Sequence, residues 1–365
     1  MPVRAGGRSP GSSRRGASLL SAGIRRRRAI SRRRRSAYLA RTRDAVTPES
    51  PLPSAPSVPG LREIQAPIRD RLDRVSDEMW RIVQADVDIV QAASAHLRGM
   101  RGKLFRPTLL LLASSVDGTP EDRALPLAAV SELVHLTSVV HDDSVDHSVL
   151  RRGQPTLNAL FSHQVAVLMG DFLFSKAIAE LVRLGDLEAL RVFTAASNEM
   201  TLGELRQLAS FDALSFSEAD YQRLILAKTA SLVGAACEMG ALAGAPRFRR
   251  QLRQFGERMG MAFQVADDLL DYTAQEEVTG KPTGLDLREH KVTLPLIAAL
   301  PMMSRAQRGR VDALFADPVP SDESIAEVVG IVAECGGLDY ARRQGEGWAA
   351  EAEEALVDIP DSDVR

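Results

Sequence analysis

The chain has 365 residues, and 45% of them are hydrophobic, which is enough for a large packed core. Its two cysteines, Cys237 and Cys335, lack the spacing of a disulfide framework or a zinc site, and this fits a reducing compartment. No run of about 18 uninterrupted apolar residues occurs, so we expect at most peripheral membrane contact. Residues 1–43 contain fourteen arginines and no acidic residue. The rest of the chain therefore has 32 basic and 48 acidic residues, and this negative charge makes nucleic acid a poor partner for it.

Residues 1–58 differ in composition from the rest of the chain. They are rich in Arg, Ser, Gly and Pro, with "RRRR" at 25–28 and again at 32–35, and the Pro-rich stretch "TPESPLPSAPSVPG" (47–60) follows across their end. This composition predicts a disordered leader and linker. A transit peptide, a nucleic-acid-binding or lipid-binding tail, or a translation start assigned too far upstream would have the same composition. We expect a cytoplasmic protein, with organelle targeting as the less favoured alternative.

Residues 59–365 are predicted to form one all-α domain. Apolar residues recur with helical spacing, and Ala, Leu, Glu, Arg and Gln dominate the segments. No alternation of strands and helices, no G-x-G-x-x-G fingerprint and no repeat with a period of about 20 to 50 residues is present. In chain order, the predicted helices cover 61–79, 84–98, 104–115, 122–142, 163–184, 187–209, 217–243, 247–271, 293–300, 304–315, 321–333 and 337–356.

Two clusters of aspartates end apolar helices of this set. In "HDDSVDHSVLRRG" (141–153), Asp142 and Asp146 are four residues apart and share a helix face, Asp143 flanks them, and His135 lies seven residues earlier on the same stripe. The sequence "FQVADDLLDYT" (263–273) repeats this arrangement. Asp267 and Asp271 are again four residues apart, Asp268 flanks them, and Gln264 lies seven residues before Asp271.

The repetition of this motif predicts a cation site. One acidic cluster alone is more often a solvated helix end, but desolvating unpaired carboxylates at two apolar helices is costly. Like charges about 4 Å apart repel by roughly 4 kcal/mol at an effective dielectric constant near 20. Ligation by oxygen alone favours Mg²⁺, which typically bridges one or two carboxylates to substrate phosphates. The predicted ligand is therefore a polyphosphate.

Basic residues near both clusters support a phosphate ligand. Each one taken singly would be assigned to the surface, but together they could hold two separate diphosphates, one bridged by metal and one held by side chains. They are Lys103, Arg106, Arg151, Arg152, Lys228, Lys281 and Lys291.

These residues resemble the trans-prenyl diphosphate synthases, or polyprenyl synthetases, over about residues 60–357. The family landmarks occur in order: "GKLFRP", "HDDSVDHSVLRRG", "VLMGDFLFSKA", "GELRQL", "AKTASL", "FQVADDLLDYT", "TGKPTGLDL" and "HKVTLPL". The resemblance implies the isoprenoid synthase fold, with antiparallel helices around a deep central cavity, and usually a homodimer. It also implies an enzyme that condenses isopentenyl diphosphate with an allylic diphosphate.

Site roles follow from the resemblance by position. It implies about three Mg²⁺ ions per active site, with Asp142, Asp146, Asp267 and Asp271 as ligands and with Asp143, Asp268 and Lys228 completing the catalytic set. The allylic diphosphate positions are Arg151, Lys228, Thr229, Gln264, Lys281 and Lys291. The isopentenyl diphosphate positions are Lys103, Arg106, His135 and Arg152.

The residues before the first aspartate bear on product length. In this family, bulky aromatic residues four and five positions before it stop chain growth. This chain has the small residues Ser138 and Thr137 at these positions, and Val134, two turns before Asp142, is also modest in size. Only two residues separate Asp143 from Asp146. Both features favour an octaprenyl to decaprenyl product of the kind used in quinone side chains, unless Phe172 or Phe174 closes the tunnel.

The chain departs from the family pattern in two places, and several other functions stay as alternatives. Where many relatives have G-G-K-R-x-R, residues 101–106 are R-G-K-L-F-R, with one basic residue fewer. The chain ends at "VDIPDSDVR", where the family usually adds a final helix that we expect to be missing. The alternatives are a short-chain (farnesyl or geranylgeranyl) diphosphate synthase, a non-catalytic subunit of a heteromeric synthase, a terpene cyclase, and an Arg-rich nucleic-acid binder that would rest on residues 1–43 alone.

Overall fold

The computed structural model describes residues 59–100, 102–151, 153–208, 213–273, 283–362 and 364. The predicted leader and the site residues Arg152 and Lys281 lie outside this set. Residues from Gly60 onward form one compact unit of the chain. Among the described residues of this unit, all regular secondary structure is helical apart from one short hairpin, which confirms the all-α prediction.

The first half of this unit contains long helices and the hairpin. The predicted helix over 61–79 is broken near Pro67, since proline lacks the N–H that a helix interior needs. The elements are α2 (Leu61–Ile64), η1 (Ala66–Ile68), α3 (Arg69–Ile82), α4 (Asp88–Gly99), α5 (Phe105–Ser115), α6 (Ala124–Val145), β1 (Leu150–Arg151), β2 (Gln154–Pro155), α7 (Leu157–Leu160), α8 (His163–Leu184) and α9 (Leu187–Leu208).

The second half begins with a helical segment that changes type. The helix predicted over 217–243 contains a π-helical turn at Leu226–Ala230, and such turns are frequent at functional sites. The elements are η2 (Ala213–Ser215), α10 (Glu218–Ile225), η3 (Leu226–Ala230), α11 (Ser231–Leu242), η4 (Pro246–Phe248), α12 (Arg249–Thr273), α14 (Leu285–Arg288), α15 (Leu294–Ala299), η5 (Leu300–Met302), α16 (Arg305–Ala316), α17 (Asp322–Glu334) and α18 (Gly337–Ala355).

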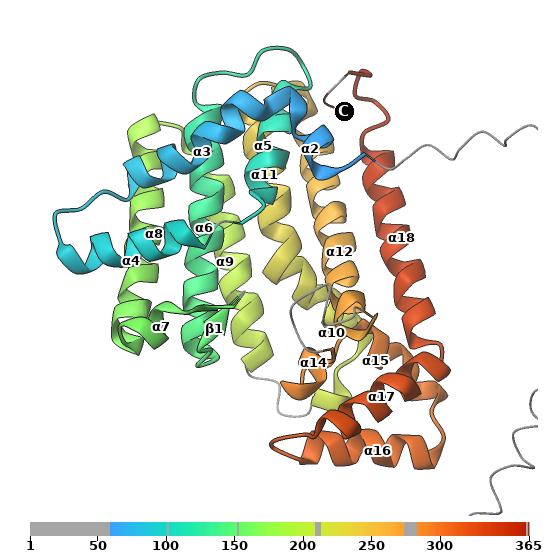
Figure 1. Cartoon of the computed structure of the whole chain (residues 1–365). Helices are drawn as coiled ribbons and strands as arrows, with labels where there is room; N and C mark the ends of the chain where they lie inside the picture. Colours follow the sequence, from blue (N-terminus) through green and yellow to red (C-terminus); the bar gives the residue numbers. More distant parts are fainter. Residues whose placement is uncertain are drawn as a thin grey trace, which may run out of the picture. The chain divides into compact units, whose positions relative to one another are not determined.

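Helix α11 lies at the centre of the bundle and packs against α5, α6, α9 and α12 (Figure 1). Every residue from Leu232 to Ala241 is buried, as expected for a helix that is apolar all round. The one buried charge there, Glu238, accepts hydrogen bonds from Arg249 Nε at 2.7 Å and Arg253 Nη1 at 2.8 Å. These bonds join α11 to α12 and satisfy the buried carboxylate.

The long helices run side by side, with shorter ones across both ends. Figure 1 shows α6, α8, α9, α11, α12 and α18 roughly aligned, with α3 crossing at the top and α16 and α17 crossing at the lower right. Two glycines let α9 and α12 approach η3 closely. A Cβ on Gly203 would lie 2.9 Å from Ala227 Cβ, and one on Gly260 would lie 2.5 Å from Ala230 Cα.

Two helical segments, Ala124–Val145 and Glu218–Leu242, are long and apolar enough to cross a membrane by length and composition alone. In their apolar windows, 61% and 78% of the residues are buried inside the structure. Buried core helices pass the same test, so this finding is a weak indication of a membrane span. The expectation of at most peripheral membrane contact stays a prediction.

Cys237 and Cys335 both have free thiols. Cys237 is buried within α11, and burial raises the pKa of its thiol to about 12. Such a thiol is chemically inert at neutral pH because little thiolate forms.

Candidate active site

The aspartate clusters occupy the last turns of α6 and α12, and charges between them link the two helix ends. Lys291 is the linking residue. Burial disfavours its ammonium form, but its pKa is raised overall by a hydrogen bond to Glu289 and by the charges of Asp146 and Asp286. Asp146 belongs to the first cluster, while Asp286 lies beside Asp271 of the second. The two acidic helix ends therefore face the same region.

Asp142 is the half-buried carboxylate of the first cluster. Its Oδ2 lies 3.8 Å from Lys228 Nζ. Burial raises its pKa; Lys228 opposes that effect, whereas the negative charges of Glu204 and Asp146 add to it. A carboxylate that is desolvated and repelled by its neighbours is well suited to receive a cation.

Asp143 points toward the hairpin and is buried, with 6% of its surface exposed. It accepts a hydrogen bond from Arg151 Nε at 2.8 Å, which ties α6 to β1. Burial raises the pKa of Asp143, and the bond to Arg151 counteracts this. Asp143 therefore holds a predicted phosphate-binding arginine in place.

Lys228 lies on the π-helical turn and makes its closest ion pair with Glu204 on α9, Nζ to Oε2, at 2.5 Å. Glu204 belongs to the landmark "GELRQL", but the sequence pattern gave it no role. The four-residue spacings within one helix could not indicate it, because Glu204 and Lys228 meet only through the packing of α9 on η3.

Asp268 of the second cluster points inward, with 4% of its surface exposed. It accepts hydrogen bonds from Tyr221 Oη at 2.5 Å and Gln264 Nε2 at 2.8 Å, and Thr229 Oγ1 donates to Gln264 Oε1 at 2.8 Å. Burial raises the pKa of Asp268 to about 6, although both donors favour its charged form. The predicted residues Thr229, Gln264 and Asp268 thus form one chain of hydrogen bonds with Tyr221, which the sequence did not single out.

Asp267 and Asp271 differ in their surroundings. Asp267 is exposed, and no hydrogen bond or ion pair to another described residue engages its carboxylate. Asp271 accepts backbone N–H bonds from Leu285 and Asp286, each at 3.1 Å, which anchors the start of α14. Burial and the charges of Asp271 and Asp268 raise the pKa of Asp286 to about 7. Asp286 is a further carboxylate that lay in the landmark "TGKPTGLDL" without an assigned role.

Comparison with known proteins decides the family. Residues 87–332 match the model of the polyprenyl synthetase family. The chain belongs to the polyprenyl synthetase family. It is therefore a trans-prenyltransferase with the all-α isoprenoid synthase fold.

Relatives of this polyprenyl synthetase include enzymes with different products. An all-trans-nonaprenyl-diphosphate synthase (geranyl-diphosphate specific) of Rhodobacter capsulatus is 37% identical over 83% of this chain and 94% of its own length. A short chain isoprenyl diphosphate synthase of Methanothermobacter thermautotrophicus is 34% identical over 81% of this chain and 93% of its own. A polyprenyl synthase of Caulobacter crescentus, solved with calcium and isoprenyl diphosphate, superposes with a TM-score of 0.79 at 32% identity, covering 84% of this chain and 94% of its own.

Three of the predicted isopentenyl diphosphate residues of this polyprenyl synthetase lie in the described part of the chain, just before α5, on α5 and on α6. Lys103 is exposed just before α5. Arg106 is half-buried, and its buried Nε has no hydrogen-bond partner. Burial lowers the pKa of Arg106, and the charge of Glu132 opposes this. His135 is half-buried on α6, where its backbone carbonyl accepts a bond from Ser138 Oγ at 2.8 Å. The buried Nε of Arg106, which has no partner, is suited to donate a hydrogen bond to an anion.

The predicted chain-length residues lie on α6, N-terminal to Asp142. Val134 and Thr137 are 3% and 6% exposed, and Thr137 Oγ1 has no hydrogen-bond partner. In the same apolar cluster, the rings of Phe174 on α8 and Phe193 on α9 contact each other in a tilted arrangement, with centroids 5.5 Å apart. Small α6 side chains therefore share the cluster with an aromatic pair.

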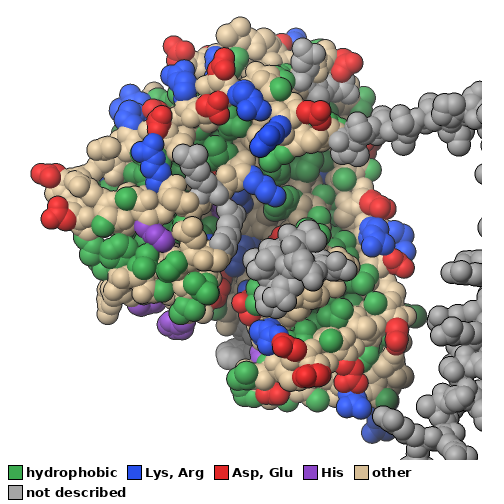
Figure 2. Space-filling view, viewed as in Figure 1, with side chains coloured by type: hydrophobic (Ala, Val, Ile, Leu, Met, Phe, Trp, Pro, Cys, Tyr) green, Lys and Arg blue, Asp and Glu red, His purple; other side chains and the backbone are tan. Residues whose placement is uncertain are grey.

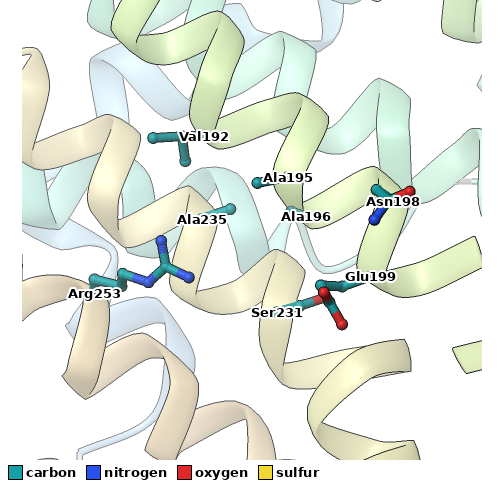
Figure 3. Close-up of a pocket in the computed structure, with 8 residues that line it drawn as sticks. All are labelled: Val192, Ala195, Ala196, Asn198, Glu199, Ser231, Ala235 and Arg253. Carbon is teal, nitrogen blue, oxygen red and sulfur yellow. The ribbon is translucent and has the colours of Figure 1, made fainter. Parts of the chain in front are cut away.

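The surface offers two hollows of interest. Figure 2 shows one near the middle of the viewed face, with Lys and Arg side chains along its upper rim. A second hollow, of about 220 Å³, lies between α9, α11 and α12 (Figure 3). It is lined by Val192, Ala195, Ala196, Asn198, Glu199, Ser231, Ala235 and Arg253. None of these is a predicted site residue.

Proposed function

We propose that this enzyme extends an allylic diphosphate with isopentenyl diphosphate units in a Mg²⁺-dependent reaction and makes a long-chain polyprenyl diphosphate. The observation that carries the proposal is the shared region at the ends of α6 and α12. There Lys228 lies beside Asp142, and Lys291 interacts with the charges of Asp146 and Asp286. This charge pattern suits a diphosphate held between metal and basic side chains.

The aspartate carboxylates at the site suit Mg²⁺ ions that bind together with the diphosphate substrate. No group of three or more His, Cys, Asp or Glu side chains among the described residues is arranged as a complete metal site. Mg²⁺ does not need such a group of side chains when its ligands are waters, one or two carboxylates and the phosphate oxygens of a substrate. Asp142 and Asp146 would hold it on one side and Asp267 on the other. Asp271 remains a predicted ligand by its position in the second aspartate cluster.

The protein's part in the reaction is electrostatic. When bound, Mg²⁺ supplies positive charge beside the leaving diphosphate. Lys228 and Lys291 stabilise the negative charge that develops as the allylic C–O bond breaks to give an allylic cation and pyrophosphate. The isopentenyl double bond then forms the new C–C bond to that cation, and the released pyrophosphate takes the proton that is lost. The apolar interior excludes the water that would quench the cation.

Small residues on α6 favour a long product. Val134 belongs to the apolar cluster, and Thr137 is buried three residues later on α6, so neither position before Asp142 carries an aromatic ring. The nonaprenyl-diphosphate synthase is also among the chain's relatives. The Phe174–Phe193 pair is the feature that could shorten the product.

One incubation tests the activity, the metal and the product together. The purified chain would receive farnesyl diphosphate, labelled isopentenyl diphosphate and MgCl₂, with a matched reaction containing excess EDTA. We expect polyprenyl products of octaprenyl to decaprenyl length with Mg²⁺ and none with EDTA. Absence of any product would refute the proposed activity, whereas products that stop at geranylgeranyl length would refute only the long-chain part.

We also propose that the enzyme is a homodimer. Large apolar side chains are unusually exposed on α8 and α9, with Leu168 and Leu187 both 66% exposed and Val182 63% exposed. Exposed apolar residues concentrated on neighbouring helices mark protein interfaces. Light scattering during gel filtration would test this, and a monomer would refute it. The cytoplasmic location and the expected absence of a final helix stay predictions.

A further inference from the structure

The strongest feature that the proposed function leaves unused is the position of Glu204. Lys228 Nζ lies 2.5 Å from Glu204 Oε2 and 3.8 Å from Asp142 Oδ2, so one ammonium group stands between two carboxylates from different helices. The three side chains are partly shielded, with exposures of 35% for Lys228, 23% for Glu204 and 27% for Asp142. Partial burial makes this arrangement stronger than an exposed surface pair.

Local backbone geometry fixes the Glu204–Lys228 pair. Gly203 packs so closely on η3 that an added Cβ would lie 2.9 Å from Ala227 Cβ. This brings residue 204 next to residue 228. The π-helical turn changes the helical register at the same place. Two departures from ordinary helix packing thus meet at this ion pair.

We propose that Glu204 is a positioning residue that holds the Lys228 ammonium group away from Asp142, so that Asp142 stays available to metal and Lys228 to the diphosphate. The inference rests on the proposed function, in which Lys228 contacts the allylic diphosphate. Lys228 forms ion pairs with Glu204 and Asp142, so removal of Glu204 leaves Asp142 as its partner. Lys228 would then move onto Asp142 and compete with the cation for it.

A double-mutant cycle on Glu204 and Lys228 tests the proposal. The variants are Glu204→Gln, Glu204→Asp, Lys228→Ala and the Glu204→Gln/Lys228→Ala double variant. Glu199→Gln is the matched control, because it removes the same charge from an exposed position of α9 with no ion pair to a described residue. Each protein is measured for kcat, for KM of both substrates and for its melting temperature. Mn²⁺ affinity without substrate is measured by electron paramagnetic resonance.

Glu204→Gln is expected to lower kcat about tenfold, a typical coupling between contacting residues. KM for isopentenyl diphosphate should be unchanged, and Mn²⁺ affinity should fall severalfold. Glu204→Asp keeps the charge and should recover part of both losses. In the Lys228→Ala background, Glu204→Gln should have little further effect on kcat and a smaller effect on Mn²⁺ affinity. Glu199→Gln should match the unaltered enzyme.

The results that would overturn the proposal are separate from those that would overturn the proposed function. If Glu204→Gln behaves like Glu199→Gln, or if its losses are the same with and without Lys228, Glu204 does not act through Lys228. If Glu204→Gln melts far below the unaltered enzyme, the proposal is judged by Glu204→Asp and by the cycle in Mn²⁺ affinity. Partial recovery in Glu204→Asp and a loss of Mn²⁺ affinity that depends on Lys228 support it, and the absence of both overturns it. If the unaltered enzyme and Glu199→Gln both make no product, the proposed function fails, and the Mn²⁺ cycle still tests the role of Glu204.

Discussion

Tyr221→Phe would remove one buried donor from the second acidic cluster while keeping the ring. Tyr221 is 2% exposed and its Oη lies 2.5 Å from Asp268 Oδ2. Hydrogen bonds to charged groups contribute about 1.5 to 3 kcal/mol, so we expect the free energy of unfolding at pH 8 to fall by about 2 kcal/mol. The aromatic packing is retained, so little of this loss would come from a cavity.

The pH dependence gives this prediction its sign. Asp268 has a pKa of about 6 in the folded protein against 3.8 as its ordinary value, so folding favours the protonated form. Its ionisation costs about 3 kcal/mol of stability, lost as pH rises from about 4 through 6. Tyr221 stabilises the ionised form and limits this loss. In Tyr221→Phe the pKa rises further, so the variant should be much closer to the parent at pH 5 than at pH 8.

Urea unfolding followed by circular dichroism, in EDTA at pH 5 and pH 8, measures the effect. Unchanged slopes against urea would show that the same transition is compared. A destabilisation equal at both pH values would refute the link to Asp268 ionisation, and no destabilisation at pH 8 would refute the contribution of the bond. Phe216→Leu, at a half-buried residue of the apolar cluster that contains Tyr221, controls for general loosening because its effect should not depend on pH.

Three further substitutions test the site. Asp142→Ala should lower kcat by about 10²- to 10³-fold, as loss of a transition-state charge partner does. Its melting temperature should stay unchanged, because folding already disfavours the charged form of this carboxylate. Near-normal turnover would exclude a metal-binding role for Asp142. Lys103→Ala should raise KM for isopentenyl diphosphate and leave that for the allylic substrate unchanged; the reverse result would mean that the two phosphate sites are exchanged. Thr137→Phe should shorten the products seen by chromatography, and an unchanged product distribution would show that growth is limited elsewhere.

Hydrophobic periodicity predicted the long helices well because it follows burial directly. The predicted ranges 163–184 and 187–209 coincide with α8 and α9 to within a residue at each end. The errors occur where a backbone feature interrupts the period, as at the break near Pro67 and the π-helical turn at Leu226–Ala230. The hairpin of β1 and β2 has only two residues per strand, too few for an alternating pattern.

The site was predicted in part, for a similar reason. Spacing placed Asp142 and Asp146 on one helix face and Asp267 and Asp271 on another. It could not show that Asp268 points inward to Tyr221, or that Asp271 caps α14. Glu204 was beyond reach as well, because its partner Lys228 lies on a different helix. Contacts between helices depend on packing angles that one sequence does not contain.

The π-helical turn places an extra residue in an otherwise continuous helical segment. Each residue added to a helix rotates the downstream side chains by about 100° around the axis. Deleting one residue near Ala227 would therefore turn Lys228 away from Glu204 and Asp142 while restoring regular α-helical bonding between α10 and α11. The same rotation would turn Glu238 of α11 away from Arg249 and Arg253. A shortened chain of this kind should therefore be both less stable and a poorer catalyst, so the irregular turn is what lets the core contacts of α11 and the direction of Lys228 coexist.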